Sequence, residues 1–97
     1  MLEHIVLMRW KDDASSESID RVLTELRALK AKIPAIVDLT CGANFSDRSK
    51  GYTHGLAVRF KDRAGLEIYG PHPEHQRVVQ NFIKPIAADV LAVDYEF

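Results

Sequence analysis

The sequence predicts an α+β protein with a ferredoxin-like fold, in which strands and helices follow one another in the order βαββαβ. Three observations lead to this prediction. First, an apolar segment at the start of the chain is followed by a segment with the apolar period of an amphipathic helix. Second, apolar and polar residues alternate in a segment near the middle, and third, a helical region interrupted by proline precedes a final apolar segment. Two helices then cover one face of a four-stranded antiparallel sheet. With 97 residues and no repeat or linker, residues 1–97 are expected to form a single domain.

The first half of the chain supplies a strand, a helix and a second strand. From Leu2 to Trp10, apolar residues occupy both alternating sets, which predicts a strand covered on both faces. Capping residues follow, and a helix is then indicated by apolar residues three and four positions apart: Ile19, Val22, Leu23, Leu26, Leu29 and Ile33. Pro34 ends this helix, and residues Ile36 to Phe45 predict the second strand.

The second half contains the most regular strand of the sequence. After a polar loop, the segment from Tyr52 to Phe60 alternates, which puts one set of side chains on one face: Tyr52, His54, Leu56, Val58 and Phe60. A helical stretch with Leu66 is broken at Gly70-Pro71, and a second helix begins at Pro73. Residues Val90 to Tyr95 predict the closing strand.

The face of the sheet away from the helices also carries apolar side chains. Ile5 and Leu7 on the first strand and Ala57 on the third would face water in a monomer. Because monomers rarely expose such a patch, we expect a homodimer in which sheet packs on sheet.

Composition narrows the possible partners. Lys+Arg 13 against Asp+Glu 14 gives a net charge of −1, which provides no field to attract nucleic acid or an anionic membrane. No apolar run approaches the ~18 residues that span a bilayer, and the start of the chain lacks the features of a signal peptide. Cys41 is the only cysteine, which fits a reducing compartment. The sequence therefore predicts a cytoplasmic protein with neither a nucleic-acid nor a membrane partner.

The residues suited to proton transfer are concentrated in two segments, Gly51–His54 and Tyr69–His75. Strand alternation places His4 on the face of Val6 and Met8, and His54 on the face of Leu56 and Val58. Tyr69, His72 and His75 recur three apart, so a roughly helical backbone would put them on one side. We expect a small-molecule pocket between sheet and helices, lined by these groups and by aliphatic side chains.

The chemistry suggested by this pocket is enolisation next to a carbonyl. An imidazole with a pKa near ~6.5 lets His75 take and return a proton, while the Tyr69 hydroxyl donates a hydrogen bond to the developing oxyanion. A structural alternative stays open, in which these groups cap the second long helix and bond to its backbone. His72 and His75 with Glu74 form only a fragment of a metal motif, and no phosphate-binding glycine loop occurs, so neither a metal nor a cofactor is predicted.

Five segments together resemble the stress-responsive A/B barrel family, called Dabb. They run nearly end to end through the chain: His4–Lys11, Ile33–Ile36, Gly51–Phe60, Tyr69–His75 and Val93–Tyr95. The resemblance implies a dimeric α+β barrel, in agreement with the apolar second face of the sheet.

The chain is also similar to a polyketide cyclase of this family, which closes a linear thioester by aldol condensation without a metal. This similarity implies that Tyr69 and His75 are catalytic and that the other pocket histidines are His4, His54 and His72. Two phenylalanines that line the cyclase pocket are replaced here by Val22 and Leu23, so a different pocket shape is expected. The full set of substrate-binding residues predicted is His4, His54, His72, Val6, Met8, Val22, Leu23, Leu26, Leu56 and Val58.

Three functions remain open from the sequence. The first is a cofactor-free enzyme that acts on an enolisable carbonyl compound. The second is a non-catalytic dimer that binds an apolar molecule or contributes to stress tolerance. The third is an oxygen-dependent monooxygenase without a cofactor, as found on related dimeric barrels.

Overall fold

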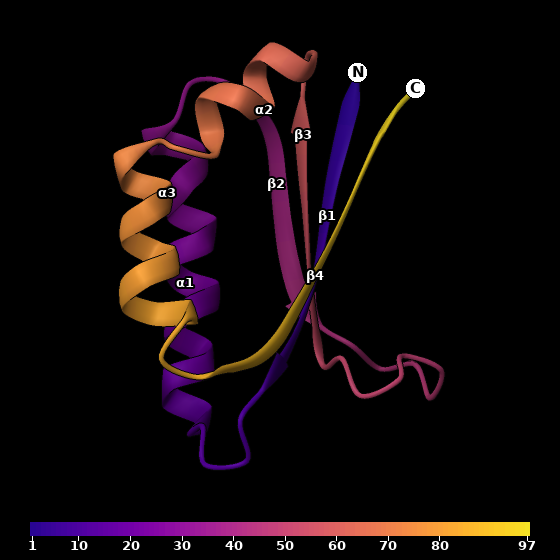
Figure 1. Cartoon of the computed structure of the whole chain (residues 1–97), viewed down its shortest axis with the longest axis vertical. Helices are drawn as coiled ribbons and strands as arrows, with labels where there is room; N and C mark the ends of the chain where they lie inside the picture. The colour runs from indigo at the N-terminus through magenta and orange to yellow at the C-terminus, as the bar shows by residue number, and fades with distance from the viewer.

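The computed structural model describes residues 1–97 and confirms the ferredoxin-like fold (Figure 1). Its elements are β1 (Leu2–Trp10), α1 (Ser16–Lys32), β2 (Ile36–Ala43), β3 (His54–Phe60), α2 (Arg63–Tyr69), α3 (Pro73–Val78), the π-helical turn η1 (Val79–Ile83) and β4 (Ala87–Glu96). The strand order is β2-β3-β1-β4, and each neighbouring pair is antiparallel. Figure 1 shows α1 and α3 side by side over one face of the sheet, with both chain termini at the same end.

Helix α1 forms where the apolar period predicts it. The Ser15 side chain caps its first turn by accepting a hydrogen bond from the Ser18 amide, and Glu17 and Lys30 lie at the ends that the helix dipole favours. Its buried face packs on the sheet through Val22, Leu23, Leu26 and Leu29. The resulting core is continuous with the helix-facing side of β1 and β3.

Three strand boundaries differ from the prediction. Strand β2 ends at Ala43 instead of Phe45, because the Asn44 side chain accepts a hydrogen bond from the Ser46 amide and turns the chain. Strand β3 begins only at His54, after Lys50 and Gly51 adopt positive φ angles of 56° and 91°. Strand β4 is longer than expected, running from Ala87 to Glu96 along β1.

The sheet face opposite the helices is apolar and uncovered. Across the β1–β4 ladder, Ile5 pairs with Val93 and Leu7 pairs with Leu91. Leu91, Val93 and Tyr95 remain 44%, 52% and 49% exposed. The apolar second face expected from the sequence is therefore present.

None of the helices has both the length and the apolar character that a bilayer-spanning segment needs.

Candidate functional site

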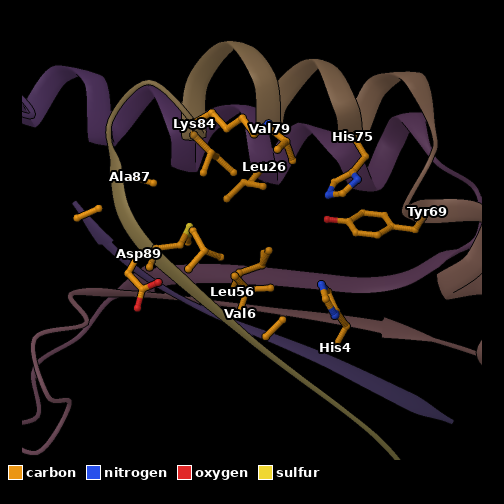
Figure 2. Close-up of a pocket in the computed structure, with 15 residues that line it drawn as sticks. His4, Val6, Leu26, Leu56, Tyr69, His75, Val79, Lys84, Ala87 and Asp89 are labelled. Atoms are coloured by element: carbon orange, nitrogen blue, oxygen red, sulfur yellow. The ribbon is translucent and has the colours of Figure 1, made fainter. Parts of the chain in front are cut away.

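A cavity of about 470 Å³ lies between the sheet and the helices, with its walls built mainly from β1, β4 and the end of the helical region (Figure 2). Its size is within the usual range for small-molecule sites. Most of its wall is aliphatic, and its polar groups gather at two ends. The lining residues are His4, Val6, Met8, Leu26, Leu56, Tyr69, His75, Val79, Ile83, Lys84, Ala87, Ala88, Asp89, Val90 and Ala92.

Tyr69 forms one polar end of the cavity from the last position of α2. Its ring packs against the Phe60 ring at 5.2 Å and the His75 ring at 4.1 Å between centroids, which leaves only 2% of the residue exposed. Figure 2 shows its hydroxyl pointing into the cavity. Burial raises the pKa of Tyr69, so the phenol stays protonated and acts as a hydrogen-bond donor.

His75 is held in one tautomer by the backbone. Its Nδ1 lies 2.8 Å from the carbonyl oxygen of Gly70, and because a carbonyl can only accept, Nδ1 carries the proton and donates. The second ring nitrogen, Nε2, is then free to accept a proton. Burial lowers the pKa of His75, and the nearby imidazoles of His4 and His72 act in the same direction, so the ring is a neutral base at neutral pH.

His4 completes this end of the cavity from strand β1. The β1–β4 register places it opposite Asp94, and its Nδ1 donates to Asp94 Oδ1 at 2.5 Å. Its ring and the Tyr69 ring form a T-shaped pair, with 5.9 Å between ring centroids and 64° between the ring planes. A carboxylate that holds one nitrogen of an imidazole fixes the ring orientation and leaves the other nitrogen for a ligand.

Some of the residues predicted to line a pocket between sheet and helices do line this cavity. Besides Tyr69 and His75, the cavity is lined by His4, Val6, Met8, Leu26 and Leu56. The strand alternation that put these β1 and β3 residues on the helix side is therefore correct at each of these positions.

His72 does not line the cavity, although the three-residue spacing placed it beside Tyr69 and His75. Gly70 and Pro71 interrupt the helical path, so the three side chains do not share one side. Instead His72 is the N-cap of α3, and its Nδ1 accepts a hydrogen bond from the Glu74 amide at 3.1 Å. For His72 the structural alternative, in which the side chain caps the helix, is therefore the one observed.

His54 also lies outside this cavity, at the far end of β3. The indole of Trp10 donates to His54 Nδ1 at 2.9 Å, and since an indole can only donate, this nitrogen is unprotonated. Three further predicted residues do not reach the cavity: Val22 and Val58 are fully buried in the core, and Leu23 is 8% exposed next to β2.

No group of three or more His, Cys, Asp or Glu side chains is arranged to hold a metal ion.

A family model described as the stress responsive A/B barrel domain matches residues 2–97. The chain belongs to this family. Among its Dabb relatives is a stress-response A/B barrel domain-containing protein of Arabidopsis thaliana, which is 35% identical over 95 residues, covering 98% of this chain and 36% of the relative. The chain spans less than half the length of this relative and of a second Arabidopsis protein of the same description.

Two further comparisons bear on this Dabb protein. Olivetolic acid cyclase of Cannabis sativa is 26% identical over 76 residues, covering 76% of this chain and 75% of the enzyme. The crystal structure of a dimeric ferredoxin-like protein from Thermobifida fusca superposes with a TM-score of 0.87 at 28% identity, covering 99% of this chain and 90% of that one.

Three polar residues of this Dabb domain's site were not predicted: Asp94, Lys84 and Asp89. Asp94 lies in a family-like segment, but its contact with His4 depends on the register of β4 against β1. Lys84 precedes Pro85, where a lysine at a helix end is normally solvated, and only the π-turn brings it to the cavity. Asp89 lies just before the predicted strand, and no sequence pattern around it indicates a site residue.

Acidification is expected to destabilise the fold. The pKa values of His54 and His75 are both lowered from the ordinary 6.5, chiefly because burial disfavours the charged ring. In the window below pH 6.5 the unfolded chain therefore binds more protons than the folded chain. The stability present above this pH is lost as pH falls through the lowered folded-state pKa values. Urea unfolding at pH 7.5 and pH 5 measures the loss.

A substitution of His54 tests its share of this effect. In His54→Gln, the amide oxygen can still accept the Trp10 hydrogen bond without a titrating group. We expect this variant to lose less stability on acidification than the wild type. An equal loss in both proteins would contradict a contribution from His54.

Proposed function

We propose that this protein binds a small apolar, carbonyl-bearing molecule in the cavity and catalyses cofactor-free proton transfer beside its carbonyl group. The observation that carries this proposal is the 4.1 Å contact between the Tyr69 and His75 rings at one end of a largely aliphatic cavity. The reaction class is enolisation, followed by ring closure where the ligand offers a second carbonyl. The name of one relative, olivetolic acid cyclase, supports this class.

The proposed step uses His75 as the base. Nε2 of His75 takes a proton from the carbon next to a carbonyl, and the electron pair of the C–H bond forms the C=C bond of an enolate. The enolate carbon then attacks a second carbonyl carbon of the same molecule, forming a C–C bond, and the new alkoxide takes the proton back from His75. No oxidant or reductant is required.

Tyr69 stabilises the negative charge that develops on the carbonyl oxygen. A hydrogen-bond donor in a dry site is worth far more than in water, and the buried Tyr69 ring is held in place by Phe60 and His75. His4, fixed by Asp94, is placed to orient the ligand next to Tyr69.

Proton transfer can be tested directly by deuterium exchange. Wild-type protein in D₂O is expected to accelerate loss of the α-proton NMR signal of cyclic β-diketones or β-keto thioesters, and Tyr69→Phe is expected to slow it. His54→Gln, a change outside the cavity, serves as the control. If no carbonyl compound binds or exchanges faster than in buffer, the proposed function is wrong.

A second candidate function is a non-catalytic, stress-responsive dimer. It is favoured by the names of the two Arabidopsis relatives, both of which are stress-response proteins. This candidate predicts that ligands raise thermal stability, by about 2.7 kcal/mol at 100 times Kd, without any exchange of α-protons. Oxygen uptake with quinol-like aromatics would instead point to the cofactor-free monooxygenase.

We further propose that the chain forms a homodimer through the uncovered sheet face. The apolar residues of β1 and β4 on this face support the proposal, as does the dimeric state of the Thermobifida fusca protein.

A further inference from the structure

The cavity has a second polar end, opposite Tyr69 and His75. Figure 2 shows Lys84 and Asp89 at this end, with Val6, Leu26 and Leu56 between the two ends. A ligand that fills the cavity would therefore meet polar groups at both ends and aliphatic side chains along its middle.

The π-helical turn is what brings Lys84 to this cavity. In an α-helix, residues three and four positions apart share a face, so Val79 and Ile83 would be neighbours and Lys84 would turn away. Here the amide of Lys84 donates to the carbonyl oxygen of Val79 at 2.8 Å, closing a turn five residues long. The wider turn places Val79, Ile83 and Lys84 together on the cavity wall.

Lys84 has no anionic partner within the chain. Its ammonium takes part in none of the protein's ion pairs. Asp89 lines the same end of the cavity, but its carboxylate accepts the Tyr52 hydroxyl at 2.5 Å. That hydrogen bond, and more weakly the nearby Arg9 guanidinium, lower the pKa of Asp89. The Asp89 carboxylate is thus engaged with Tyr52, and no ion pair joins it to Lys84, which leaves Lys84 as the unpaired charge at this end of the cavity.

We infer that the ligand of this cavity is an organic acid, whose carboxylate pairs with Lys84 while its carbonyl lies at Tyr69 and His75. This inference rests on the proposed function, because it assumes that the ligand occupies this cavity. The aliphatic middle of the wall fits an apolar chain or ring between the two polar groups. The π-turn then determines ligand specificity, since it brings to the cavity wall the only lysine or arginine among the lining residues.

The inference is tested with a matched pair of probes, octanoate and 1-octanol, which share an apolar chain and differ in charge. Isothermal titration calorimetry of wild type is expected to show octanoate binding about three- to tenfold more tightly, a difference typical of a partly exposed ion pair. This preference is expected to shrink at high salt. The Lys84→Met variant keeps an apolar stem and is expected to lose the preference, whereas Lys84→Arg retains it.

Lys61→Met is the matched control, because Lys61 is exposed and lies outside the cavity wall. It is expected to leave both affinities unchanged. If wild type binds both probes equally and Lys84→Met changes neither affinity, the inference is overturned while the cavity remains a binding site. If neither probe binds nor shifts the NMR signals of Tyr69 and His75, the inference and the proposed binding function are both overturned.

Discussion

Replacing His75 by alanine is expected to lower kcat for an enolisable substrate by about 10²- to 10⁴-fold, the usual contribution of a general base. KM is expected to change much less, because the aliphatic wall that binds the substrate stays intact. Steady-state kinetics and α-proton exchange at saturating substrate measure the loss. The expected cause is specific: Nε2 is the free nitrogen of a ring whose other nitrogen donates to Gly70.

Tyr69→Phe separates the hydroxyl from the ring. The substitution keeps the packing against Phe60 and His75 and removes only the donor, so kcat is expected to fall by about 10²- to 10³-fold. The double variant is expected to lose little more than His75→Ala alone, because the two groups serve one step. Unchanged kcat in either single variant, with His54→Gln as a matched control, would remove that residue from the mechanism.

The pH profile gives a further check on His75 in the same kinetics. Because the pKa of His75 is lowered from 6.5, the base stays unprotonated at neutral pH. We expect kcat/KM to be flat near neutrality and to fall only below pH 6.5, as His75 gains a proton. If kcat/KM already decreases as the pH is lowered from 9 towards 7, the base is another group, with a pKa above neutrality.

The fold could be predicted from the sequence because its apolar periods are local. The three- and four-residue period of α1 and the alternation of β3 each follow from a few consecutive residues. The end of β2 and the start of β3 could not be placed, since they depend on single features, the Asn44 turn and the positive φ of Gly51.

Part of the site was predictable, but the shared helix face on which the prediction relied is not what brings its residues together. Tyr69 and His75 do meet, but across a break at Gly70-Pro71 instead of along one helix face. The same break turns His72 into a helix cap. The place of Lys84 on the cavity wall depends on the π-turn, and the contact of Asp94 with His4 depends on the strand register. Neither feature can be predicted from a local pattern of residues.

The variant Val93→Glu is expected to convert a dimer into a monomer. Val93 is 52% exposed and pairs with Ile5 in the middle of the apolar sheet face. In a symmetric dimer the substitution occurs twice, so two carboxylates would be buried without partners. Light scattering after size-exclusion chromatography, at micromolar protein, measures the change in mass. Ile68→Glu, on an exposed site of α2, is the matched control and is expected to stay dimeric.

Dissociation is also expected to weaken ligand binding, because strand β4 serves both surfaces. Its alternation sends Leu91 and Val93 to the outer sheet face and Val90 and Ala92 to the cavity wall. The strand is held on one edge by β1 alone, so a partner sheet that covers its outer face would also fix its inner face. We expect Val93→Glu to bind octanoate more weakly than Ile68→Glu, although neither residue touches the cavity. A wild type that is monomeric at micromolar concentration, or a dimeric Val93→Glu, would contradict the sheet-to-sheet interface.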